Sequence, residues 1–93
     1  MKKVELVAEV AEKAGLSRQA AQSALEAAFE SISVALQRGD EVRIQGFGTF
    51  AVNARAETSG RNPQTGEPIR IPAARVPRFR AGKNLRDVVN AAG

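Results

Sequence analysis

The 93-residue chain contains no cysteine, histidine, tyrosine or tryptophan, and it carries a formal net charge of +4. These absences argue against an enzyme and against a metal or other cofactor, because the usual acid–base, nucleophilic and zinc-binding groups are missing. The lack of cysteine, and of any apolar stretch long enough for a signal peptide or membrane span, predicts a soluble cytoplasmic protein.

The length predicts one domain over residues 1–93. Its core is expected to be thin, because 17 of the apolar residues are alanines, which contribute little buried area each. Neither a disulfide nor a structural zinc can compensate. Association with a second subunit is the remaining source of stability.

Two helices are predicted at the start of the chain, forming a helical hairpin over residues 1–39. Apolar residues recur at helical spacing in 4–14 and again in 18–38. Gly15 fits a left-handed C-terminal position, and Ser17 can cap the second helix. The second helix is apolar and rich in alanine, which favours packing against another helix over reading of the major groove.

From residue 40 onward the apolar period changes to two, which predicts strands over 40–54 and 75–81. Gly46-Phe47-Gly48 provides the tight connection of a β-hairpin. Pro77 favours an edge or bulged position in the returning strand. A short C-terminal helix is expected over 82–92, and the fold class is therefore α+β.

Residues 55–74 differ from the rest, because they are rich in glycine, proline and threonine and hold too few large apolar residues for a core. A long segment of this kind is either disordered or functional. The turn chemistry of Arg61–Gly66 folds it into a two-stranded ribbon of about 25 Å. We expect this arm to protrude.

The positive charge is concentrated in the second part of the chain. Residues 1–52 carry a net charge of −1, whereas residues 53–93 carry eight Lys or Arg against three Asp or Glu, a net of +5. Such asymmetry indicates a polyanionic partner, either nucleic acid or an anionic membrane surface. A merely solubilising surface is the alternative.

Arginines along the arm can place guanidinium groups against phosphates and groove floors. They are Arg55, Arg61, Arg70 and Arg75. The other arm side chains are small, as a ribbon entering the minor groove requires. Pro63 at the tip is either a simple turn residue or a wedge that unstacks a base step and kinks the duplex.

Two motifs at this separation, Gly46-Phe47-Gly48-Thr49-Phe50 and Gly60-Arg61-Asn62-Pro63-Gln64-Thr65-Gly66, closely resemble those of the histone-like HU/integration host factor family of bacterial nucleoid proteins. The resemblance covers essentially the whole chain. It implies an intertwined dimer with a helical hairpin base, a three-stranded antiparallel sheet, two long β-ribbon arms that embrace double-stranded DNA, and a short C-terminal helix. No membrane partner is implied.

The resemblance also assigns residues. It implies that Pro63 intercalates and that Arg55, Arg61 and Asn62 contact the minor groove and the backbone. The phosphate-binding surface would be extended by Lys3, Arg80, Lys83 and Arg86, and the predicted dimer core comprises Phe29, Phe47, Phe50 and Phe79. The chain departs from many relatives at Ala51 and Thr58, where a basic residue is common.

Three functions follow from these observations. The first is an architectural protein that bends, wraps and compacts nucleoid DNA with little sequence preference, as a homodimer or with a paralogue, and prefers bent, nicked or gapped DNA. The second is a sequence-selective bending subunit of the integration host factor kind. The third is an interaction dimer whose basic arm binds a protein or an anionic surface instead of DNA.

Overall fold

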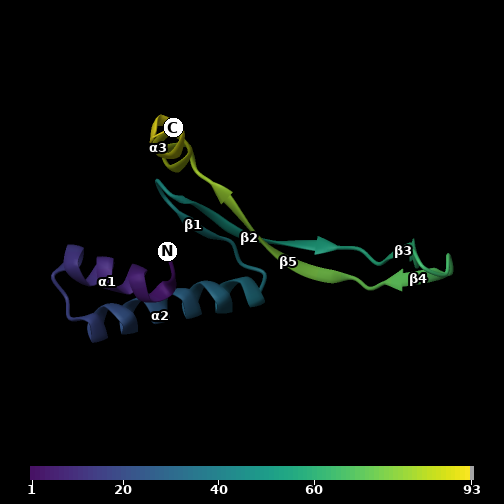
Figure 1. Ribbon diagram of the computed structural model, residues 1–93, viewed down its shortest axis with the longest axis horizontal. Helices are drawn as coiled ribbons and strands as arrows, with labels where there is room; N and C mark the ends of the chain where they lie inside the picture. The colour runs from purple at the N-terminus through teal and green to yellow at the C-terminus, as the bar shows by residue number, and fades with distance from the viewer. Residues whose placement is uncertain (93) are drawn as a thin grey trace. The chain divides into compact units, whose positions relative to one another are not determined.

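The computed structural model describes residues 1–92, which form three helices and five strands (Figure 1). In chain order these are α1 (Lys3–Ala14), α2 (Arg18–Gln37), β1 (Val42–Ile44), β2 (Gly48–Arg55), β3 (Thr58–Arg61), β4 (Pro68–Ile71), β5 (Ala74–Ala81) and α3 (Lys83–Ala92). The predicted α+β class is confirmed. The backbone divides into two compact units, one over Met1–Ala35 and one that starts at Leu36. That both belong to one domain stays a prediction.

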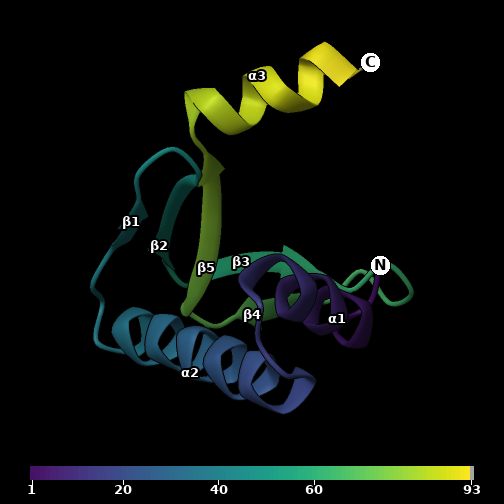
Figure 2. The same ribbon diagram turned by 90° about the vertical axis from the view of Figure 1, so that its left-hand side faces the viewer.

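The first unit is a helical hairpin whose ends are set by local chemistry. Gly15 has φ of 69° and follows α1, where the Leu16 N–H donates to Ala11 O at 2.9 Å. Ser17 Oγ accepts a hydrogen bond from the Ala20 N–H at 3.1 Å, as an N-cap does. The predicted turn between the helices is therefore confirmed, and Figures 1 and 2 show the two helices side by side.

The core of this unit consists of small side chains. Val7, Ala11 and Ala21 are the buried hydrophobic residues, and Val10 and Leu25 pack partly buried against them. Alanine at the contact lets two helices approach closely, but it removes little apolar area from water. The expectation of a thin core holds for this unit.

The second unit contains a three-stranded antiparallel sheet in the order β1-β2-β5. β2 and β5 pair without interruption over eight positions, from Gly48 opposite Ala81 to Arg55 opposite Ala74. Gly48 is required by close packing, because a Cβ there would lie 2.5 Å from Phe79 Cζ and 2.7 Å from Arg80 O. Pro77 lies in β5, an edge strand, as predicted.

The arm is a separate two-stranded ribbon of β3 and β4, which continues the chain beyond β2 and β5 (Figure 1). Four pairs hold it, from Thr58 opposite Ile71 to Arg61 opposite Pro68. The ladder is broken at residues 56–57 and 72–73, so the paired part of the arm is shorter than the range 55–74. Pro72 lies in the break, and proline has no N–H to donate to a ladder.

The tip of the arm is closed by backbone hydrogen bonds. The Asn62 N–H donates to Glu67 O at 2.8 Å, and the Gly66 N–H donates to Asn62 O at 2.7 Å. Gly66 has φ of 74°, a left-handed conformation that glycine adopts without strain. The predicted turn is confirmed, and Pro63 lies exposed within it.

The C-terminal helix α3 starts beside the β1–β2 turn (Figure 2). The Gly82 N–H donates to Phe47 O at 2.8 Å, and Gly82 O then accepts from the Arg86 N–H in the first helical turn. Val88 and Val89 of α3 are strongly exposed. Across residues 1–92, no helix combines the length and apolar character that a membrane crossing requires.

Candidate nucleic-acid interface

Strand pairing divides the side chains of the sheet between two faces. Directly opposite residues of an antiparallel pair lie on one face, and successive residues alternate between faces. Thr49 lies opposite both Arg43 of β1 and Arg80 of β5. Ala51 lies opposite Arg78, and Arg55 lies at the end of the same alternation. One face therefore carries four arginines, Arg43, Arg55, Arg78 and Arg80, which we call the basic face.

The basic face is exposed and carries cations with few carboxylate partners. Arg55, Arg78 and Arg80 form no ion pair within the part of the chain that the structure describes, whereas Arg43 lies 3.7 Å from Glu41. The side chains between the arginines are short, with Thr49, Ala51 and Asn53 along β2. Such a surface can approach a phosphate backbone closely.

The opposite face is aromatic. Phe50 and Phe79 are directly paired, with ring centroids 4.8 Å apart, and Phe47 packs against Phe79 at 5.5 Å. Val52 opposite Pro77 continues this apolar face. These rings contact one another, but Phe47 and Phe79 remain exposed over more than two fifths of their surface.

Arg75 lies on the aromatic side of the sheet, unlike Arg78 and Arg80. It is opposite Ala54, and its Nη2 donates to Leu36 O at 3.2 Å near the C-terminal end of α2. A cation at a helix C-terminus interacts favourably with the free carbonyl groups there. This placement gives Arg75 a structural contact, and its expected contact with DNA stays a prediction.

The two faces of the arm also differ. Arg61 and Arg70 lie on one face with Ser59, and Ile69 and Ile71 lie on the other. Gly60 makes room for the isoleucines, because a Cβ there would lie 3.2 Å from Ile71 Cδ1. The arm therefore presents one cationic and one apolar side.

Arginines brace the arm through its carbonyl groups. Arg61 Nη1 donates to Gly66 O at 2.9 Å across the turn, and Arg55 Nη2 donates to Pro72 O at 3.3 Å across the break in the ladder. A guanidinium has five N–H donors, so each side chain keeps several for another acceptor. Arg70 instead forms an ion pair with Glu57.

The tip holds the remaining predicted arm residues. Asn62 Oδ1 accepts from the Gln64 N–H at 2.9 Å, which makes Asn62 a turn-forming residue, and Thr65 Oγ1 accepts from the Glu67 N–H at 3.3 Å. These bonds orient the backbone around Pro63 and leave its ring exposed.

The other predicted cations lie outside the sheet and the arm. Lys3 Nζ is 3.2 Å from Glu26 Oε1 in the first unit, and hydrogen bonds from Gln22 and Lys3 together with the Lys3 charge lower the pKa of Glu26. In α3, Lys83 Nζ is 2.8 Å from Asp87 Oδ2, whereas Arg86 has no such partner among the described residues. Lys3 and Lys83 thus carry their charge beside a carboxylate.

The DNA-binding surface predicted from the sequence did not include Arg43 or Arg78. Both belong to the basic face. The spacing of two between Arg78 and Arg80 was visible in the sequence, whereas Arg43 joins this face only through the register of β1 with β2. Within residues 1–92 no group of histidine, cysteine or carboxylate side chains is placed to hold a metal ion.

This fold and this distribution of arginines correspond to a known class of protein. Residues 1–90 match the family described as "Bacterial DNA-binding protein", and the chain belongs to that family. The resemblance to the HU/integration host factor proteins is thereby confirmed.

Individual relatives match over nearly their whole length. DNA-binding protein HU-beta of Neisseria meningitidis is 52% identical over 89 residues, which are 96% of this chain and 100% of the relative. DNA-binding protein HRm of Rhizobium meliloti is 53% identical over 90 residues, covering 97% and 100%. Among solved structures, the Anabaena HU–DNA cocrystal structure gives a TM-score of 0.89 at 48% identity, covering 96% of this chain and 97% of that one.

HU from Thermotoga maritima is a more distant structural neighbour, with a TM-score of 0.70 at 32% identity, covering 96% of this chain and 98% of that one.

We predict that Arg75→Gln lowers stability by about 0.5–1 kcal/mol, because it removes a cation from the carbonyl end of α2. Thermal unfolding should show a fall in Tm of roughly 2–8 °C. Arg78→Gln is the matched control, since it removes the same charge from the basic face of the same strand. An equal fall in Tm for Arg78→Gln would contradict the structural assignment of Arg75.

Proposed function

We propose that this protein is an architectural DNA-binding protein of the bacterial nucleoid, which binds double-stranded DNA as a homodimer, with little sequence preference, and bends it. The observation that carries the proposal is the basic face of the sheet. The strands of this sheet lead into a slim arm that has an exposed proline at its tip. The cytoplasmic location and the absence of catalysis are parts of the same proposal.

The basic face supports binding to the phosphate backbone. Arginine donates to phosphate oxygens in a forked geometry, and each phosphate neutralised releases condensed counterions. Contacts of this kind set the position of the protein on the duplex but carry no base sequence. Arg55, Arg78 and Arg80 therefore favour binding that tolerates many sequences.

The arm supports bending. The minor groove is about 6 Å wide, and two paired strands already lie about 4.8 Å apart, so only a slim ribbon enters a groove that opens. Gly60, Ser59 and Thr58 keep this part of β3 slim. The rigid, exposed ring of Pro63 can then separate two stacked base pairs, at a cost of a few kcal/mol that other contacts offset.

The exposed aromatic side chains support a dimer. Phe29, Phe47 and Phe79 are 42%, 45% and 42% exposed, and the buried hydrophobic residues in the described chain are only Val7, Ala11 and Ala21. Large exposed apolar surfaces on a small domain are typical of an interface. A second copy that covers these rings completes the core and provides a second arm.

Binding measured against salt tests the proposed function. We expect log K for a linear duplex to fall linearly with log salt, with a slope of about −0.9 for each phosphate neutralised. Arg80→Gln should make the slope less steep, by about 0.9 for each phosphate contact that is lost. Arg75→Gln makes the same charge change on the other face of the sheet, and it should leave the slope unchanged. Negligible binding near physiological salt would contradict the proposal and favour a protein or anionic-surface partner.

Pro63→Ala should reduce the bend angle more than the affinity, because it removes the wedge and leaves the arginines in place. The measurement is end-to-end energy transfer in a labelled duplex, together with titration. The unsubstituted protein should bind a gapped duplex more tightly than a linear one, since unstacking is easier there. Gln64→Ala is the control at the neighbouring position. Equal affinity for gapped and linear DNA would contradict the wedge.

Sedimentation equilibrium at micromolar concentration should give twice the 9.9 kDa mass of one chain. Because folding and association are then coupled, Tm should rise with protein concentration. A mass of one chain, together with a Tm independent of concentration, would contradict the dimer.

Selection of bound fragments from random DNA would separate this function from a sequence-selective bending subunit, which requires a strong consensus.

A further inference from the structure

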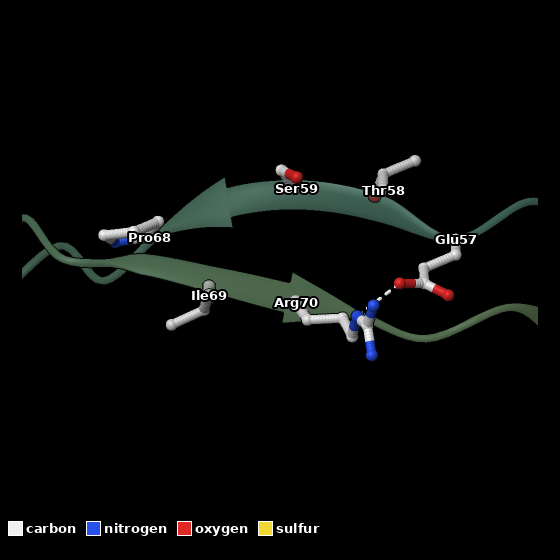
Figure 3. A pocket seen from close by; sticks show the side chains of 6 residues that line it. All are labelled: Glu57, Thr58, Ser59, Pro68, Ile69 and Arg70. Carbon is white, nitrogen blue, oxygen red and sulfur yellow. Dashed lines mark ion pairs between the residues drawn. The ribbon is translucent and has the colours of Figure 1, made fainter.

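One arginine of the arm has a carboxylate partner, and the partner belongs to the arm itself. Glu57 lies in the break between β2 and β3, and Arg70 lies near the end of β4, opposite Ser59. Figure 3 shows the two side chains pointing toward each other across the ribbon, with Arg70 Nε on Glu57 Oε1. Diagonal neighbours across a strand pair lie within reach of such long side chains.

This contact differs from those of the other arm arginines. Arg55 donates to Pro72 O and Arg61 donates to Gly66 O. A carbonyl oxygen carries no net charge, so the positive charge of each guanidinium stays uncompensated. Arg70 faces an anion, so its charge is compensated before DNA arrives. Glu67, the other carboxylate of the arm, forms no ion pair in the described chain.

The pair competes directly with a phosphate for Arg70. Both partners remain solvated, with 81% of the Arg70 side chain and 48% of the Glu57 side chain exposed, so the pair is weak and reversible. A phosphate that displaced Glu57 would leave the freed carboxylate next to the DNA backbone, where like charges repel. Opening the pair at a DNA surface therefore carries this added repulsion, which favours the paired state of Arg70.

We propose that Glu57 acts as an internal counter-ion that withholds Arg70 from DNA and so limits the affinity of the arm. The inference rests on the proposed DNA-binding function. Glu57 then limits the affinity for DNA by pairing with Arg70, in addition to the repulsion between its own negative charge and the phosphates.

The test compares four variants on one linear duplex over a range of salt concentrations: Glu57→Gln, Glu67→Gln, Arg70→Gln and the double variant Glu57→Gln/Arg70→Gln. Glu57→Gln should bind about 1.5- to 5-fold more tightly per arm, since it frees Arg70 from an exposed ion pair. Its salt slope should steepen by about 0.9 per arm, because one more phosphate is neutralised.

Glu67→Gln is the matched control, because it makes the same charge change in the same arm without freeing an arginine. It should give a smaller gain and an unchanged slope. Arg70→Gln alone should leave the slope unchanged, since Arg70 makes no phosphate contact while it is paired. In the Arg70→Gln background, Glu57→Gln should gain no more than Glu67→Gln does. Circular dichroism establishes that each variant is folded.

The remaining outcomes separate a failure of this inference from a failure of the proposed function. If the unsubstituted protein binds and Glu57→Gln behaves like Glu67→Gln, the inference is wrong and the proposed function stands. The same holds if the gain from Glu57→Gln persists in full when Arg70 is absent. If the unsubstituted protein does not bind DNA, the proposed function fails and this inference falls with it.

Discussion

The uninterrupted pairing of β2 with β5 is the constraint on which both surfaces of the sheet depend. With Phe50 opposite Phe79, the rings share one face and the arginines at 78 and 80 share the other. A slip of one residue would exchange the faces, placing charge among the rings. The close contact of Phe79 with Gly48 opposes such a slip, because any side chain at the glycine position would collide with the ring.

The same alternation links assembly to binding. A thin core leaves Phe47 and Phe79 partly in water, so burial of the aromatic face against a second copy would supply the stability that the single chain lacks. Covering that face necessarily directs the basic face outward. In the proposed dimer, the strand pairing that buries the rings is also the one that presents Arg78 and Arg80 to a ligand.

Local signals predicted much of the fold. Gly15 and Ser17 ended and started helices as expected, and the turn around Gly66 formed, because each depends on a few neighbouring residues. The side on which Arg75 lies was not predicted, because arginines occur at both parities of β5 and only the register with β2 separates them. The break around Pro72 likewise depended on how the two legs of the arm align.

The partner of each cation, rather than the number of cations, determines what the basic half of the chain can offer to a polyanion. Arg55 and Arg61 donate to carbonyl oxygens and keep their full charge, while they also hold the arm in shape. Arg70 and Lys83 lie against carboxylates, so their charge is already compensated. The net charge of a segment therefore describes its long-range attraction, whereas its short-range contacts follow from which guanidinium groups the fold leaves without an anion.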